Sequence, residues 1–202
     1  MSRIVVFFLA FGISFLGSIP PGSINISVMQ LSIQQQRGAA LSLALGAVLI
    51  ESIYAGISLS FLQLLSEKEL LYQILMWITG LGLMILGMIN FFSSSSSKSF
   101  NHEKNTRKRN SFLKGVFLGL INPLSIPFWL GMTTYLSSNG WLHLGSDSWF
   151  YIFGLASGTF FLMIMVDLLG SRFRAVADNR WVVHRLPGIL FMIMGLYYLI
   201  TL

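Results

Sequence analysis

The stretch FLGSIPPGSI, residues 15–24, begins like an apolar helix and is then interrupted by two prolines and a glycine. A second stretch, FLGLINPLSI at residues 117–126, repeats it 102 positions later with seven of ten residues identical. Proline lacks a backbone N–H, and its ring clashes with the preceding turn of a helix. We therefore expect two broken helices, one interrupted at Pro20-Pro21-Gly22 and the other from Asn122-Pro123 through Pro127.

The composition of the chain predicts an integral membrane protein. Of its 202 residues, 54% are hydrophobic and only 10% are charged. Uncharged stretches recur at about the 20 residues that a helix needs to cross roughly 30 Å of hydrocarbon. The predicted fold class is an all-α integral membrane protein with six transmembrane helices, of which the first and fourth are broken. We expect these helices at residues 4–31, 39–64, 70–92, 112–136, 149–169 and 186–202.

The distribution of basic residues predicts how the chain crosses the membrane. Eleven of the thirteen lysine and arginine residues lie in or beside the loops on one side of the alternating spans. Since cytoplasmic loops carry the excess of positive charge, both termini should lie outside the cytoplasm. The halves 1–92 and 112–202 each hold three helices, an odd number, so the second half enters the membrane from the opposite side. The sequence thus predicts two inverted three-helix repeats, joined by a basic, serine-rich cytoplasmic loop at residues 93–111.

A helix broken at mid-membrane exposes backbone groups that hydrocarbon cannot satisfy. Such groups persist where they are buried in protein or line a wet cavity, and half-helix ends there present partial charges to a polar ligand. We therefore predict a substrate site between the two breaks; the alternative is a pair of packing kinks without a ligand. The amides of Asn25 and Asn122 should either cap a broken helix end or contact the substrate. The predicted substrate-binding residues are Pro21, Gly22, Ser23, Asn25, Asn122 and Pro123.

Two carboxyl groups fall inside predicted spans. Glu51 lies at the middle of the second span, where an ionisable group costs about 3 kcal/mol. Small residues continue its helical face, so it should point into the bundle and exchange a proton or pair with a cationic substrate group. The alternative for Glu51 is a protonated, structural hydrogen-bonding role. Asp167, near the end of the fifth span, is the second predicted proton-coupling residue, unless it simply pairs with Arg172 or Arg174.

Small residues recur at helical spacing on three of the predicted spans. Such stripes let helix backbones approach one another closely in a membrane. We expect them to serve packing and assign them no chemistry. Their members are Ser14, Ser18 and Gly22, then Gly38, Ser42 and Gly46, and finally Gly154 and Gly158.

The sequence predicts neither a metal site nor a cofactor. It contains no cysteine, which excludes thiolate ligands, disulfides and thiol redox chemistry. Its histidines, His102, His143 and His184, lie in loops or at a helix mouth without the partners of a metal site. The net charge of +6 comes from short loops rather than from a basic face, so we expect membrane lipid and no nucleic acid as a partner.

Four stretches of the chain resemble the LysE/RhtB family of amino-acid exporters. They are IPPGSIN (19–25), RGAALSLALGAVLIESIY (37–54), FLKGVFLGLINPLSIPFW (112–129) and LPGILFMIMGLYYL (186–199). The family's proline-glycine and asparagine-proline motifs are matched by Pro21-Gly22 and Asn122-Pro123. Its usual proline-glycine-proline ends in Ser23 here, and its second-helix acidic residue, often aspartate, is Glu51. The resemblance implies a bacterial inner-membrane exporter with two inverted halves, driven by the proton motive force.

These features predict a secondary transporter rather than an enzyme, exporting an amino acid or a similar small polar solute by proton antiport. Divalent cation export is the alternative within the same superfamily. An intramembrane hydrolase with Ser23 as its nucleophile is an alternative from another class, but His184 should lie at the cytoplasmic mouth, far from Ser23. The sequence leaves open which solute is carried and whether the active unit is a monomer or a homodimer.

Overall fold

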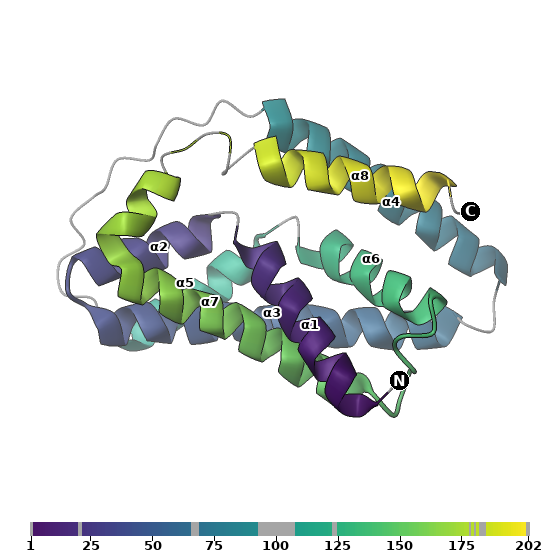
Figure 1. The fold of residues 1–202 in the computed structure, drawn as a ribbon, viewed down its shortest axis with the longest axis horizontal. Helices are drawn as coiled ribbons and strands as arrows, with labels where there is room; N and C mark the ends of the chain where they lie inside the picture. Colours follow the sequence, from purple (N-terminus) through teal and green to yellow (C-terminus); the bar gives the residue numbers. More distant parts are fainter. Residues whose placement is uncertain are drawn as a thin grey trace.

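The computed structural model describes all residues except 1, 20–21, 66–68, 93–107, 123–124, 178, 180, 182–184 and 201–202. The regular elements of this part are eight α-helices, which confirms the predicted all-α fold (Figure 1). Most of the predicted loop at 93–111 lies outside the described residues. The helices are α1 (Arg3–Ser18), α2 (Ser23–Ile33), α3 (Arg37–Leu65), α4 (Glu69–Phe92), α5 (Lys108–Leu120), α6 (Ser125–Ser138), α7 (Ser148–Ala177) and α8 (Leu186–Ile200).

Helices α3 and α7 are each long and apolar enough to cross a membrane, over Arg37–Gln63 and Ser148–Gly170. The pairs α1–α2 and α5–α6 pass the same test as single bent spans, with bends of 78° and 66°. The apolar parts of α4 and α8 are shorter, Trp77–Phe92 and Gly188–Tyr197. By length and composition the described residues thus provide two spans, or four with the bent pairs, against the six predicted. The 15 residues of α8 rise only about 22 Å, less than the hydrocarbon thickness.

Both predicted breaks are present in the structure. Helix α1 ends at Ser18 and α2 begins at Ser23, whereas α5 ends at Leu120 and α6 begins at Ser125. Each boundary of the second break therefore lies 102 positions after the corresponding boundary of the first, as in the repeated sequence. The repeated motif interrupts the helix at the same place in each half.

The prolines explain where the helices stop. Pro20, Pro21 and Pro123 fall in the two gaps and lie outside the described residues. Pro127, in contrast, lies in the first turn of α6, so the prediction that the second break extends through it is wrong. The first N–H groups of a helix have no partner within the helix, and a proline there costs no hydrogen bond.

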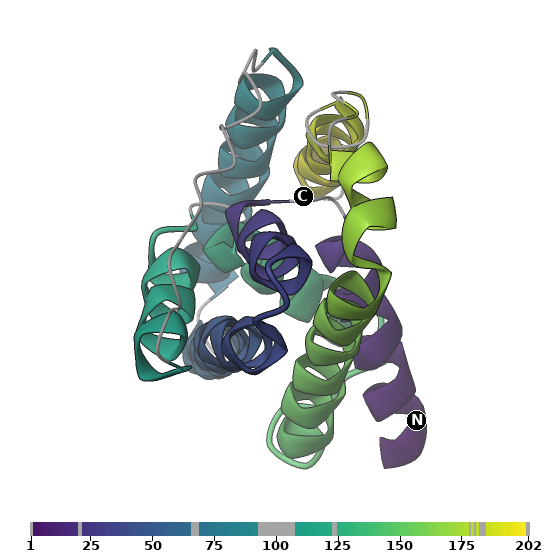
Figure 2. The same ribbon diagram turned by 90° about the vertical axis from the view of Figure 1, so that its left-hand side faces the viewer.

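The helices pack in three side-by-side pairs. Helix α1 runs along α7, α3 runs along α5, and α4 runs along α8 (Figure 1). Helices α3 and α7 also contact each other, and α2 packs on both of them (Figure 2). Helix α6 packs on α3. The two long helices therefore form the centre, and each bent pair places its two halves against them.

Glycines lie where the backbones of the paired helices touch. A Cβ atom at Gly154 or Gly158 on α7 would overlap a backbone oxygen of α1, and one at Gly46 on α3 would overlap a backbone oxygen of α5. This confirms the predicted packing role of these three glycines. Gly22 differs, because no atom lies within 4 Å of its Cβ position.

The contact between α4 and α8 is also built on glycine. Gly80 faces Gly195, and Gly87 faces Gly188, with each Cβ position close to the backbone oxygen of the opposite residue. Higher numbers on one helix thus meet lower numbers on the other, so α4 and α8 are antiparallel. The absence of side chains at these positions lets the two backbones pack directly.

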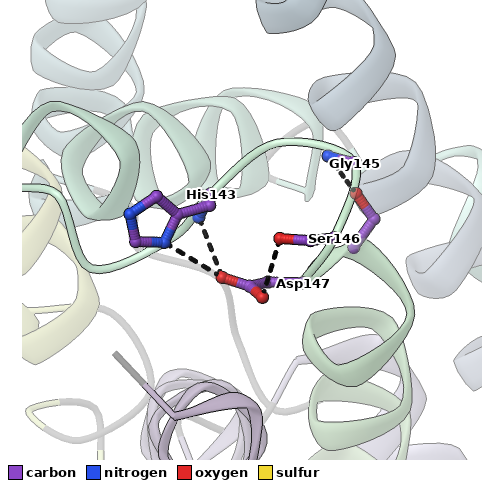
Figure 3. A network of polar contacts seen from close by, with 5 residues as sticks. His143, Gly145, Ser146 and Asp147 are labelled. Carbon is purple, nitrogen blue, oxygen red and sulfur yellow. Dashed lines mark hydrogen bonds and ion pairs between the residues drawn. The ribbon is translucent and has the colours of Figure 1, made fainter.

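A carboxyl group closes the turn between α6 and α7 (Figure 3). Asp147 Oδ2 accepts a hydrogen bond from the His143 N–H and lies 3.2 Å from His143 Nδ1, while Oδ1 accepts from the Ser146 hydroxyl. The Gly145 N–H donates to Ser148 Oγ at 3.2 Å. Burial alone would raise the pKa of Asp147, but the hydrogen bonds from His143 and Ser146, together with the charge of a protonated His143 ring, lower it overall.

Replacing Asp147 by asparagine should lower the free energy of unfolding at neutral pH by about 1 kcal/mol, because hydrogen bonds to a charged acceptor are weakened. The pKa of Asp147 is lower in the folded protein, so its stabilisation is full above the unfolded pKa of about 3.9 and is lost as the pH falls through the folded value. Thermal unfolding in detergent should therefore distinguish the two proteins at neutral pH, and the two should converge only well below pH 4, at or below the lowered pKa of folded Asp147. An equal difference at both pH values would contradict this account of the turn.

Candidate functional site

Glu51 lies in the middle of α3 and faces the inside of the bundle. It is 8% exposed, and its neighbours on the same helical face, Ala47 and Ala55, are fully buried. Ile53 and Ile57, on the opposite face of α3, are about half exposed, at 45% and 54%. The predicted orientation of Glu51 is therefore confirmed, while its role stays a prediction.

A hydroxyl group of α7, linked in turn to a hydroxyl group of α1, holds the Glu51 carboxyl group. Thr159 Oγ1 on α7 lies 2.8 Å from Glu51 Oε2. Ser14 Oγ on α1 lies 2.5 Å from Thr159 Oγ1 and donates to the backbone oxygen of Leu155 at 2.8 Å. Ser14 and Thr159 are both fully buried. Three helices thus meet in one chain of hydrogen bonds, which we call the Glu51 network (Glu51, Thr159 and Ser14).

The first helix break adjoins the Glu51 network. Ser18, the last residue of α1, places its hydroxyl 3.4 Å from Thr159 Oγ1. The Ser18 backbone oxygen accepts a hydrogen bond of 2.7 Å from the side-chain amide of Asn25, across the break. This bond satisfies one of the carbonyl groups that a helix end leaves without an intrahelical partner. The predicted capping role of Asn25 is therefore confirmed, and its contact with a substrate stays a prediction.

The second helix break is also tied to α3. The hydroxyl of Tyr54, one turn from Glu51, donates to the backbone oxygen of Leu120 at 3.0 Å. Leu120 is the last residue of α5 and corresponds in the repeat to the last residue of α1. Asn122 lies in the break, and its backbone oxygen accepts a hydrogen bond from the N–H of Ser125, where α6 begins. One turn of α3 therefore contacts the end of α5 directly, through Tyr54, and is linked to the end of α1 through Thr159.

None of the hydrogen bonds described above joins the other predicted substrate-binding residues to the Glu51 network. Gly22 and Ser23, at the start of α2, are exposed, and none of the hydrogen bonds described for the Glu51 network includes them. Pro21 and Pro123 are not among the described residues. Of the six predicted residues, the structure therefore brings only Asn25 next to the network through a described contact.

Asp167 occupies a different place on α7. It lies eight residues after Thr159, about 12 Å along the helix. It is 5% exposed, and its backbone oxygen accepts a hydrogen bond from the Ser32 hydroxyl on α2. Its Oδ1 has no hydrogen-bond partner in the part of the chain that the structure describes. The side chains of Arg172 and Arg174, its predicted alternative partners, lie outside that part.

The partner of Glu51 is the functional residue that sequence reasoning missed. Within the predicted span 149–169, only Ser157 and Thr159 offer small hydroxyl groups, so a search for a partner of Glu51 could have reached two candidates. The rotation of α7 decides between them, because Thr159 is buried and Ser157 is exposed. The sequence predicts only a packing role for Ser14, whereas its hydroxyl belongs to the network.

Thr159→Val keeps the shape of the side chain and removes the hydroxyl, so Glu51 and Ser14 lose their shared partner. The free energy of unfolding in detergent should fall by about 1–3 kcal/mol. Ser157→Ala is the matched control, because Ser157 is exposed and its hydroxyl donates to Phe153 of the same helix. That change should stay within about 0.5 kcal/mol. Equal losses from the two variants would show that the buried hydroxyl has no special role.

The described site consists of carboxyl, hydroxyl and amide groups. No group of three or more histidine and acidic side chains that could hold a metal ion occurs among the residues that the structure describes. His143 pairs with Asp147 in the turn before α7, and His102 and His184 are not described. Groups of this kind can hydrogen-bond a polar solute, and a carboxyl group can also take up and release a proton.

Apolar spanning helices, two of them broken, around a buried carboxyl group define a multi-pass membrane protein. The family model of the LysE type translocator matches residues 15–202, and the chain belongs to this family. LysE type translocators are transporters of small solutes and not enzymes, as the resemblance in the sequence implied. Searches among curated proteins and among solved structures gave no match.

Proposed function

We propose that this translocator exports an amino acid or a similar small polar solute across the bacterial inner membrane in exchange for protons, and that Glu51 carries the proton. The Glu51 network is the observation that carries the proposal. It joins an ionisable side chain at the middle of a long apolar helix to α1 and α7, beside the first helix break. Carboxyl groups inside a membrane are costly, and where they occur they mark ion or proton pathways.

Six spans in two inverted repeats, residues 1–92 and 112–202, are the second part of the proposal. An exchange of the halves converts α1 into α5, α3 into α7 and α4 into α8. Under this exchange the contact of α1 with α7 becomes the contact of α5 with α3, and both contacts are present. In the pairs α3–α7 and α4–α8 the exchange only swaps the two members, so each of these contacts stays the same contact. This pattern supports a two-fold relation with its axis in the membrane plane.

The glycines of α4 and α8 supply a register for this relation. At an offset of 108 positions, Gly80 corresponds to Gly188 and Gly87 to Gly195. The contact of Gly80 with Gly195 then maps onto the contact of Gly188 with Gly87, and both are observed. The register supports the same two-fold axis as the pairing of the helices.

The same register supports a position for the polar pair Glu51 and Thr159 on the proposed axis. At an offset of 108 positions, Gly46 on α3 corresponds to Gly154 on α7, and each is pressed against a backbone oxygen of the helix beside it. Glu51 then corresponds to Thr159, which is its hydrogen-bond partner. Transporters with inverted repeats bind substrate and coupling ions near the midplane, at the interface of the repeats. The Glu51 network has this position in the proposed arrangement.

A count of protons favours a protonated Glu51 in this conformation. Ser14 and Thr159 carry one hydroxyl proton each, but three contacts join Leu155, Ser14, Thr159 and Glu51. The Ser14 proton goes to the Leu155 carbonyl, which can only accept. The Thr159 proton can fill the contact with Ser14, and the remaining contact then needs a proton from Glu51. An ionised Glu51 would take the Thr159 proton, and the single Ser14 proton could then serve either the Leu155 carbonyl or Thr159 but not both.

Proton release from Glu51 would therefore disturb the contacts among three helices. Thr159 would have to turn its proton toward the carboxylate, and Ser14 would lose a donor. A ligand or proton shifts a conformational equilibrium only when it interacts differently with the two states. The network offers such a difference, which is what antiport requires of its coupling residue.

The proposed orientation follows the positive-inside rule, with both termini outside the cytoplasm and the loop at 93–111 inside it. The turn between α2 and α3, with Arg37, then faces the cytoplasm. The proposed partners are the exported solute and membrane lipid, without nucleic acid, and a homodimer is compatible with the sequence.

The medium of cells that overproduce the protein, compared with the medium of cells that lack it, tests the proposed function. One amino acid or related polar solute should accumulate outside the overproducing cells. An imposed pH gradient should drive the same solute across proteoliposomes that contain the purified protein. A metal-dependent growth difference without any change in amino acids would contradict the proposal and support divalent cation export.

A further inference from the structure

We propose that a pocket between α7 and the turn from α2 to α3 binds a zwitterionic amino acid, with Asp167 as acceptor of its ammonium group and Arg37 as donor to its carboxylate. The pocket has a volume of about 240 Å³, and its lining includes Ser32, Gln35, Arg37, Asp167 and Gly170. Pockets for drug-sized ligands measure about 300–1,000 Å³, so this one suits a smaller solute. The inference rests on the proposed export of an amino acid and assigns that solute a binding site on the way to the centre.

Asp167 lines this pocket and carries a buried carboxyl oxygen without a described hydrogen-bond partner. The residue is 5% exposed, and Oδ1 has no hydrogen-bond partner among the described residues. The nearby Ser32 hydroxyl donates to the Asp167 backbone oxygen, so its single proton does not serve the carboxyl group. A buried acceptor without a donor is unfavourable, and a ligand that supplies N–H groups removes that cost. An ammonium group supplies three of them.

Two unusual backbone conformations shape the pocket. Helix α7 departs from helical geometry at Gly170, where φ is 38°, and Gln35 has a φ of 61° although it is not glycine. Non-glycine residues persist in the left-handed region where the surroundings impose it, and such residues cluster at binding sites. The Gln35 N–H bonds the Ser32 carbonyl at 2.9 Å and so fixes the turn that leads into α3. This turn brings Arg37 to the pocket that Asp167 lines.

Arg37 supplies the opposite charge at the rim of the pocket. Arg37 is exposed and Asp167 is buried, and they form no ion pair among the contacts that the structure describes. Both groups therefore remain available to a ligand. A guanidinium group pairs well with a carboxylate, and a carboxylate accepts from an ammonium group. An acceptor and a donor at one small cavity fit a zwitterion better than they fit a simple cation or anion.

The position of the pocket suits the loading of a solute for export. In the proposed orientation the α2–α3 turn faces the cytoplasm, and Asp167 lies about 12 Å along α7 from Thr159. A solute held at the pocket would thus stand two helical turns from the Glu51 network. In this assignment Asp167 binds the substrate, whereas Glu51 carries the proton.

Binding to the purified full-length protein tests this site. Each common L-amino acid is added singly, and the one that stabilises the protein most against thermal unfolding is titrated beside its α-hydroxy acid, which lacks only the ammonium group. Asp167→Asn should raise the Kd of the amino acid about tenfold or more and change the Kd of the hydroxy acid by less than about twofold. Arg37→Gln should weaken the binding of both acids. It should leave unchanged the binding of the amine analogue, which lacks the carboxylate.

Asp147→Asn is the matched control, because it removes a carboxylate in the α6–α7 turn, outside the pocket. It should change neither Kd. Each variant is compared on two ligands in one preparation, so a general loss of folded protein would affect both ligands alike and could not imitate the expected split. The inference is overturned if Asp167→Asn affects both ligands equally, if it affects neither, or if no amino acid binds the unchanged protein.

Transport in proteoliposomes separates this inference from the proposed function. If the unchanged protein transports an amino acid while Asp167→Asn shows no split between the two ligands, the pocket assignment fails and the exporter proposal stands. If the unchanged protein transports no amino acid, both fail.

Discussion

Glu51→Gln should abolish proton-driven export while the protein remains folded. Glutamine keeps the size of the side chain and can still bond Thr159, but it cannot release a proton. In proteoliposomes under an imposed pH gradient, the rate of solute transport should fall about tenfold or more, which corresponds to a barrier about 1.4 kcal/mol higher. The transport that remains should no longer depend on the pH gradient.

A second carboxyl-to-amide change controls for the loss of a carboxyl group as such. Asp147→Asn alters the turn before α7, outside the predicted spans, and should keep transport dependent on the pH gradient. If Glu51→Gln transports with the same pH dependence as the unchanged protein, another group carries the proton. The Glu51 network would then have only a structural role.

Gly154→Ala should destabilise the protein by about 1–3 kcal/mol, although alanine is the better helix former. A Cβ atom at this position overlaps the backbone oxygen of Phe7 on α1, which cannot rotate away. Gly12→Ala is the matched control, because no atom lies within 4 Å of the Cβ position of Gly12 on α1. Gly12→Ala should stabilise the protein by up to about 1 kcal/mol. The two variants should therefore change the free energy of unfolding in detergent in opposite directions.

Gly46→Ala tests the proposed two-fold relation in the same assay. A Cβ atom at Gly46 overlaps the backbone oxygen of Phe112 on α5, as one at Gly154 overlaps that of Phe7 on α1. The two variants should therefore lose similar stability. An alanine that is tolerated at one of these positions and not at the other would contradict equivalent packing of the two halves.

The helix breaks could be predicted because proline acts locally. Residues 20–21 and 123 lie in the gaps where the sequence predicts them, and the helices end at Ser18 and Leu120. The effect of Pro127 could not be read in the same way. A proline interrupts the interior of a helix but is tolerated in its first turn, so the outcome depends on where α6 begins.

The inward orientation of Glu51 was predictable, because the small residues around it mark one face of α3. Its partner was not, since the choice of Thr159 over Ser157 depends on the rotation of α7 against α3, more than 100 positions away in the chain. The pocket of Asp167 was equally hidden. It depends on a left-handed backbone conformation at Gln35. Glycine or asparagine at this position would have indicated such a turn, but glutamine does not.

Labelling of single cysteines tests most directly whether the broken helices line a water-filled route beside Glu51, and the chain has no cysteine of its own. A charged, membrane-impermeant thiol reagent should label Ser18→Cys, at the end of α1 beside Thr159, and the exported solute should slow that reaction. The same reagent should not label Ile57→Cys, on the opposite face of α3, which the proposed arrangement turns toward lipid. Labelling at position 57 without labelling at position 18 would contradict the account.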